Sequence, residues 1–109
     1  MEFILIVKSK GVEPSVGEMQ NLIGNYAPWM RHYSESGNYL NGSPFHKEGV
    51  LVNGKGKRLY KGEFLEGSNL FTGYIHIEAE TLESAVQIAE ECPLLAFNSI
   101  VVMPILEMK

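Results

Sequence analysis

The sequence predicts a single α+β domain in which two helices cover one face of an antiparallel sheet. Two segments carry apolar residues at helical spacing behind a capping residue, and the segments around them have strand patterns or hairpin signals. Helices separated by short antiparallel strands are typical of an α+β sandwich. The chain has 109 residues, of which 45% are apolar and 20% charged, enough for one buried core. We therefore expect one domain over residues 1–109.

The first strand and the first helix are predicted from the opening third of the chain. Glu2 to Lys8 is apolar on both alternating faces, which is typical of a strand buried on both sides. Ser15 stands three residues before Glu18, the spacing of a capping box. Pro28 lies inside the helical pattern and predicts a kink at about residues 24–27. The apolar positions of this helix are Met19, Leu22, Ile23, Tyr26, Met30 and Tyr33.

The middle of the chain predicts short strands and a hairpin. Residues 39–40 and 49–52 have strand character, and residues 41–44 between them predict a loop or a bulge. The dipeptide Asn53-Gly54 is the strongest hairpin signal, and residues 58–60 supply the return strand.

The last third predicts a strand, a helix and a strand. Residues 71–78 alternate between two faces, Thr81 caps a helix that ends before Pro93, and residues 99–106 are again apolar on both faces. Two doubly apolar strands need cover on both sides of the sheet, and the two helices cover only one. A homodimer through the open sheet face is the simplest solution, because symmetric dimers are the commonest oligomers.

Charge and composition exclude several classes of protein. The net charge of −4 argues against binding to a nucleic-acid backbone. No apolar run approaches the roughly 20 residues of a membrane-spanning helix, and Glu2 rather than a basic stretch precedes the first run. Cys92 is the only cysteine, so no internal disulfide is possible, which fits a reducing compartment. We expect a cytoplasmic protein with a small-molecule or protein partner.

The histidines give no sign of a metal centre. His32, His46 and His76 lack the short spacings of metal ligands, and the single cysteine does not complete a set. We expect neither a metal nor a cofactor. A haem- or oxygen-using activity is an alternative, which would need an axial ligand, and His76 is the one histidine well placed for it.

The candidate site lies where one strand meets a polar loop. Tyr74 and His76 share a strand face by the period of two, and that face should lie away from the helices. The loop before this strand contributes Glu63 and Phe64, with Ser43 nearby, so a cleft is expected at the rim of the dimer. His76 is either a general base with Glu63 as its acidic partner, or a structural histidine that completes hydrogen bonds.

Other conspicuous residues have ordinary interpretations. Trp29 is expected to pack in the core, with the wall of a ligand cavity as the alternative. Cys92 is expected to be a buried packing residue rather than a reactive thiol. The cations Lys55, Lys57, Arg58 and Lys61 are interpreted as the solvated tip of the hairpin, with an anionic ligand at Arg58 or Lys61 as the alternative.

Several segments, taken together, resemble the YCII-related proteins, also called the DGPF family. The resemblance spans nearly the whole chain, and it depends on the order and spacing of motifs that are individually weak. These are Lys61-Gly62-Glu63-Phe64-Leu65-Glu66, Gly73-Tyr74-Ile75-His76-Ile77, and the helix from Thr81-Leu82-Glu83-Ser84-Ala85 to Cys92-Pro93.

The resemblance implies a bacterial protein with a ferredoxin-like βαββαβ unit, here with an extra hairpin, that forms a dimeric α/β barrel. It implies no single reaction, although part of the family carries a His–Asp pair. This chain departs from that pattern because it contains no aspartate. Lys61 matches the aspartate of the Asp-Gly-Pro-Phe signature, and Glu63 matches its proline.

Two functions of different classes remain open. One is cofactor-free proton transfer or elimination on a small organic acid, with His76 as the base, Glu63 as its partner and Tyr74, Phe64 and Ser43 as ligand-binding residues. The other is a non-catalytic ligand-binding or regulatory dimer that uses the same pocket. The sequence does not decide whether the protein is an enzyme.

Overall fold

The computed structural model describes residues 1–46, 48–60 and 71–107. The elements follow the predicted order, with an added 3-10 helix (η2) between the second helix and the last strand. They are β1 (Glu2–Ser9), α1 (Val16–Glu35), β2 (Tyr39–Pro44), β3 (Val50–Val52), β4 (Arg58–Tyr60), β5 (Phe71–Glu78), α3 (Leu82–Glu90), η2 (Pro93–Ala96) and β6 (Asn98–Pro104).

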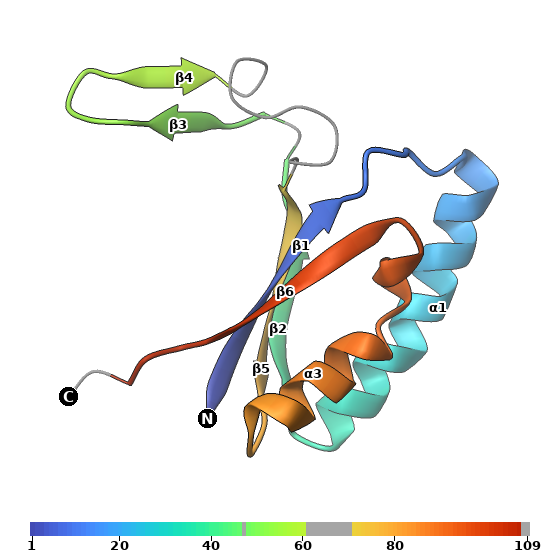
Figure 1. The fold of residues 1–109 in the computed structure, drawn as a ribbon. Coiled ribbons are helices and arrows are strands. Elements are labelled where there is room, and N and C mark those ends of the chain that lie inside the picture. Colours follow the sequence, from blue (N-terminus) through green and yellow to red (C-terminus); the bar gives the residue numbers. More distant parts are fainter. Residues whose placement is uncertain (47, 61–70, 108–109) are drawn as a thin grey trace.

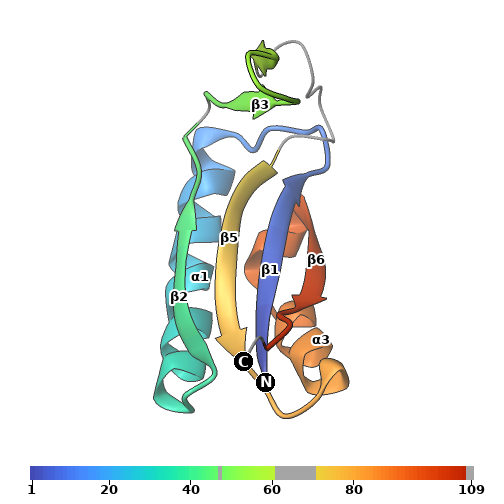
Figure 2. The same ribbon diagram turned by 90° about the vertical axis from the view of Figure 1, so that its left-hand side faces the viewer.

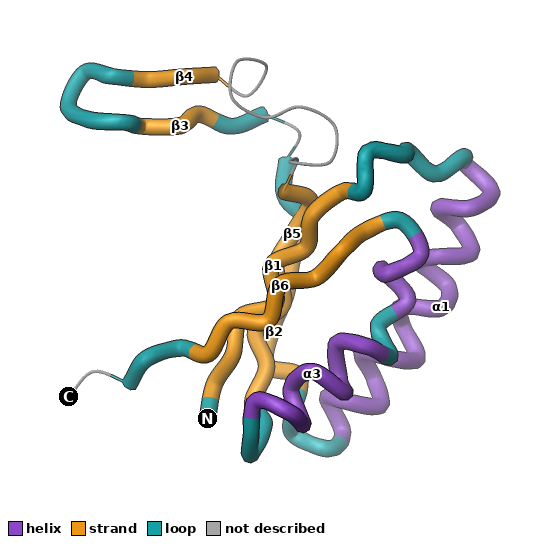
Figure 3. Tube along the Cα trace, in the orientation of Figure 1, coloured by secondary structure: helices purple, strands orange, loops and turns teal. Residues whose placement is uncertain are grey.

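The main sheet has four antiparallel strands in the order β2-β5-β1-β6. Counted within this sheet alone, the order is second, third, first and fourth, which is the ferredoxin-like arrangement. Among the described residues, the helices α1 and α3 lie on the same face of the sheet, and the opposite face carries no helix (Figures 1 and 3). Figure 2 looks onto this second face, which we call the open face. The predicted α+β fold with two helices on one face is confirmed.

Both predicted helix starts are confirmed in atomic detail. Ser15 Oγ accepts a hydrogen bond from Glu18 N (3.2 Å), and Glu18 Oε1 accepts one from Ser15 N (3.0 Å), so the capping box is complete. These bonds hold the pKa of Glu18 below its ordinary value. Thr81 caps α3 in the same way, with Ser84 as its partner. The helix α1 runs without interruption through Pro28.

The interpretation of residues 41–44 as a loop or bulge is wrong, because they form most of β2. The irregularity of this strand lies between Tyr39 and Asn41. Glycine serves here for close approach between strands rather than for a turn. A Cβ on Gly42 would lie 3.0 Å from Tyr74 O, and one on Gly73 would lie 2.8 Å from Ser43 O.

The predicted hairpin is confirmed, but its connection is longer than two residues. Val52 pairs with Arg58, so residues 53–57 form the turn. Gly54 and Gly56 both have positive φ, at 137° and 75°, a conformation that glycine adopts without strain. The two strands form a separate sheet that projects from one end of the main sheet (Figure 1).

The core lies between the sheet and the two helices. Its fully buried members include Phe3, Leu5, Ile75 and Ile77 from the two central strands, β1 and β5. Trp29 is 7% exposed, and its ring lies against the rings of Tyr26, Tyr33 and Tyr39. The expectation that Trp29 packs in the core is confirmed. No helix in the described part of the chain is long and apolar enough to cross a membrane.

Cys92 is buried in this core, as expected, and burial raises the pKa of its thiol to about 11. Alkylation needs the thiolate, so we expect the folded protein to resist iodoacetamide at pH 8 and the urea-unfolded protein to react quickly. Mass spectrometry of the two samples over time measures the difference. Equal rates in the folded and unfolded samples would contradict the buried, protonated thiol.

Candidate functional site

The structure offers two places where chemistry could occur, one on each face of the sheet. A cavity of about 500 Å³ lies on the helix side. A row of polar side chains crosses the open face at His76.

The cavity lies between the first half of α1, the segment around η2, and one end of strands β1, β2 and β5. Its apolar lining comes from both layers of the fold, because Met19 and Leu22 belong to α1 and Val7 to β1. The polar residues along it are Ser9, Glu13, Tyr26, Ser43, His46, Thr72, Tyr74 and Asn98.

Several of these polar groups are already held in place by hydrogen bonds. The Tyr26 and Tyr39 hydroxyls lie 3.2 Å apart, and burial raises the pKa of Tyr26 above its ordinary value. Tyr26 is therefore a neutral hydroxyl at any physiological pH. Thr72 Oγ1 donates to Asn98 Oδ1 (2.9 Å), and Asn98 Nδ2 donates to Leu94 O (2.9 Å). Such anchored polar groups suit a preformed binding site.

Phe45 and Tyr74 border the cavity, but the Tyr74 side chain lies on the open face, because it alternates with the buried Gly73 and Ile75 on the helix side. The Phe45 and Tyr74 rings are stacked, with centroids 5.8 Å apart and planes inclined by 27°. Ser43 lies opposite Tyr74 in the register of β2 and β5, so its side chain also lies on the open face. His46 Nδ1 accepts a hydrogen bond from Glu48 N (3.2 Å), which leaves Nε2 as the N–H donor of the neutral ring.

On the open face, His76 lies between a carboxylate and an amide. Its Nε2 lies 2.6 Å from Glu2 Oε1, and its Nδ1 lies 3.3 Å from Asn41 Nδ2. The Glu2 contact lacks the alignment of a hydrogen bond, and Nε2 is shielded from solvent. The strand register explains the row, because His76 on β5 pairs with Ile4 of β1 on one side and Asn41 of β2 on the other.

The structure brings together some of the expected site residues. Ser43 and Tyr74 line the cavity, whereas His76 is not among its lining residues. Glu63 and Phe64 lie outside the described residues. The expected cleft at a dimer rim needs a second copy of the chain, so it stays a prediction.

Sequence reasoning missed Glu2 as the carboxylate neighbour of His76, and Tyr26 as a polar group of the cavity. Glu2 is distant in sequence, and only the pairing of β1 with β5 brings it to His76. Tyr26 lies at one of the apolar positions of the predicted helix and is not among the expected site residues. Within residues 1–46, 48–60 and 71–107, no three His, Cys, Asp or Glu side chains gather as metal ligands.

The fold and the cavity define a small ferredoxin-like α+β protein with a pocket of ligand size. The chain belongs to the YCII-related domain family, whose model matches residues 1–109. No curated protein matches the chain significantly.

Among solved structures, the fold is similar to 5-chloro-2-hydroxyhydroquinone dehydrochlorinase from Burkholderia phenoliruptrix AC1100, in complex with 2,5-dihydroxybenzoquinone. The TM-score is 0.55 at 16% sequence identity, over 99% of this chain and 96% of that one. At this level of identity the likeness concerns the fold.

Proposed function

We propose that this protein binds a small, flat organic acid in the cavity between α1 and the sheet. The observation that carries the proposal is the cavity itself, because about 500 Å³ lies within the range of small-molecule sites. Its lining is largely apolar, with Met19, Leu22 and Val7 from both layers of the fold, and it has a few anchored polar groups such as the Tyr26 hydroxyl.

The fold neighbour supports this class of ligand. That protein was solved with 2,5-dihydroxybenzoquinone, a flat ring with polar groups at its rim. A molecule of this shape would place its ring between the Met19 and Leu22 side chains of α1 and the sheet, with its polar rim near the Tyr26 hydroxyl. The same compound is therefore a suitable first probe, together with a panel of hydroxylated aromatic acids.

The cavity is tested by filling it from the helix side. Met19 lines the cavity and is 41% exposed, so Met19→Trp should occupy ligand space without disturbing the sheet. We expect 2,5-dihydroxybenzoquinone to bind the unaltered protein and Met19→Trp to weaken that binding at least about tenfold, or about 1.4 kcal/mol. Isothermal titration calorimetry measures both affinities.

The matched control is Gln20→Trp, which adds the same side chain one residue along α1, at an exposed position outside the cavity lining. It should bind the probe like the unaltered protein. Equal loss in both variants would contradict the cavity as the site. If no compound of the panel binds, the proposal of a flat acid ligand is wrong.

A second candidate function is cofactor-free proton transfer or elimination by His76, and the close contact of its Nε2 with the Glu2 carboxylate favours it. A carboxylate beside Nε2 stabilises a proton on that nitrogen, which leaves the lone pair of Nδ1 as the base. The Asn41 side-chain amide contacts Nδ1 of His76, so a substrate would have to displace this amide to reach the base. A compound that binds and is converted to a product would indicate this catalytic function. A compound that binds and is released unchanged would indicate a non-catalytic ligand-binding or regulatory protein.

His76→Gln tests the role of the histidine, because glutamine keeps polar contacts and loses the titratable base. If His76 is the base, we expect turnover to fall by about 10²–10⁴-fold, the usual contribution of a general base, with little change in probe affinity. Unchanged turnover with a lower melting temperature would show a structural histidine. Asn41→Ala is the companion variant, since it should free Nδ1 and leave the base intact.

We also propose that the protein works as a cytoplasmic homodimer through the open face. Four aliphatic or thioether side chains lie side by side on that face, at paired positions of β1 and β6: Ile4, Ile6, Val101 and Met103. Val101 and Met103 are 38% and 46% exposed in the single chain. An apolar sheet face of this kind is usually covered, and face-to-face packing of two copies would enclose a barrel.

A further inference from the structure

The hairpin of β3 and β4, residues 50–60, is an arm whose β3 side chains are apolar and exposed. Val50, Leu51 and Val52 follow one another in β3 and are 47%, 39% and 67% exposed. An isolated two-stranded sheet is marginally stable in water, so such an arm gains from packing against another surface. The arm projects on the side of the sheet opposite the helices, over one end of the open face (Figures 1 and 2).

The arm is basic, and the other end of the open face is acidic. Between residues 50 and 60 the sequence has Lys55, Lys57 and Arg58 and no carboxylate, although the whole chain carries a net charge of −4. At the opposite end, Glu2 and Glu78 are exposed and directly paired across β1 and β5. The arm and the far end of the open face therefore carry opposite charges.

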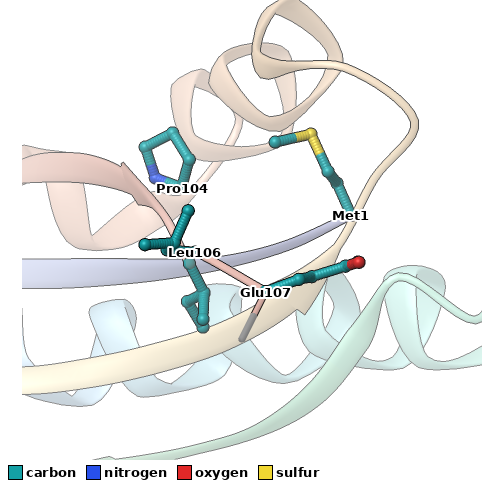
Figure 4. Close-up of a pocket in the computed structure, with 5 residues that line it drawn as sticks. Met1, Pro104, Leu106 and Glu107 are labelled. Carbon is teal, nitrogen blue, oxygen red and sulfur yellow. The ribbon is translucent and has the colours of Figure 1, made fainter. Parts of the chain in front are cut away.

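An apolar notch of about 410 Å³ lies beside this acidic end. It is lined by Met1 and by residues 104–107. Figure 4 shows Met1, Pro104, Leu106 and Glu107 gathered there, from the start of the chain, the last residue of β6 and the segment after it. Leu106 is 82% exposed, and Glu107 adds a third carboxylate to this end.

We propose that the arm of each chain docks into the notch of a second copy. Two copies packed by their open faces, with a twofold axis in the interface and perpendicular to the strands, bring the basic end of each onto the acidic end of the other. The arm then meets the partner's notch, and the same contact occurs twice. This proposal rests on the proposed dimer and adds its orientation and a second contact surface.

The physical basis is burial together with charge complementarity. Val50 and Val52 leave water against Leu106 and Met1, and apolar burial contributes roughly 25 cal/mol per Å². Lys57 and Arg58 come near Glu107 and Glu2. Three carboxylates, those of Glu2, Glu78 and Glu107, lie at the notch end. The positive α-amino group of Met1 lies beside them and offsets one of the three charges. Such pairs set orientation and association rate more than affinity.

A disulfide between copies tests the contact directly. Val52→Cys combined with Leu106→Cys places one thiol on the arm and one in the notch, while the native Cys92 is buried. Under mild oxidation we expect a covalent dimer with both introduced thiols consumed. The matched control pairs Val52→Cys with Glu83→Cys, which is exposed on α3 on the helix side, and should stay uncrosslinked. The single variants Val52→Cys and Leu106→Cys, oxidised in the same way, show whether a residue crosslinks to the same residue of a second copy.

Charge exchange gives an independent readout. We expect Lys57→Glu and Glu107→Lys each to raise the dimer dissociation constant at least threefold, and the double variant to restore it. A dimer by sedimentation, with no crosslink and no rescue, would overturn the arm contact and leave the dimer standing. If both introduced thiols are consumed and no covalent dimer forms, the disulfide is within one chain, which would show that the arm packs on its own chain. A monomer at every concentration would overturn the dimer as well.

Discussion

Replacing Trp29 with alanine is expected to destabilise the protein by about 3–5 kcal/mol, the usual cost of removing a large buried aromatic side chain. Trp29 is 7% exposed and contacts three tyrosine rings. Its Nε1 also donates to Ile88 O (3.2 Å), one of the last four carbonyls of α3, which have no partner within the helix. The side chain therefore joins α1 to the end of α3.

Urea unfolding followed by circular dichroism measures this loss, since the variant has no tryptophan for fluorescence. Trp29→Phe is the companion variant. It keeps a ring in the core and removes the donor to Ile88 O, so we expect a smaller loss that includes about 1 kcal/mol for the hydrogen bond. Full stability of Trp29→Ala with loss of probe binding would instead make Trp29 a wall of the ligand cavity.

Local signals in the sequence were sufficient for most of the fold. A cap such as Ser15 with Glu18, or a strand with period-two alternation, depends on residues close together in the chain, so the pattern is visible without the structure. The prediction for residues 41–44 was wrong because it also depended on local composition alone. The composition Asn-Gly-Ser-Pro is typical of turns, but the glycine is needed because Tyr74 O of the neighbouring strand lies too close for a side chain.

The candidate site was less predictable, because it depends on contacts between distant segments. The period of two correctly placed Tyr74 and His76 on the half-buried positions of β5 between the buried ones. The carboxylate at His76 is Glu2, 74 positions earlier in the numbering, and nothing near either residue in the sequence points to the other. The cavity is a gap left by the packing of α1 and η2 against the sheet, and no sequence pattern records such a gap.

The homodimer is tested most strongly by one charge at the centre of the open face. Ile6 on β1 lies between Tyr74 of β5 and Val101 of β6 in the strand register. In a twofold dimer Ile6→Glu would bury two carboxylates, and unpaired charges in an apolar interface cost several kcal/mol.

We expect the dissociation constant of the Ile6→Glu dimer to rise by about 10³-fold, equivalent to about 4 kcal/mol, so that sedimentation at micromolar concentration detects the 12.2 kDa monomer. The monomer should keep its circular dichroism, because Ile6 lies opposite the helix-side core and is only half-buried in the single chain. Val16→Glu is the matched control. Val16 is 79% exposed at the start of α1, on the helix side, where a carboxylate suits the helix dipole, so this variant should stay dimeric. A dimer that survives Ile6→Glu would contradict the open face as the interface.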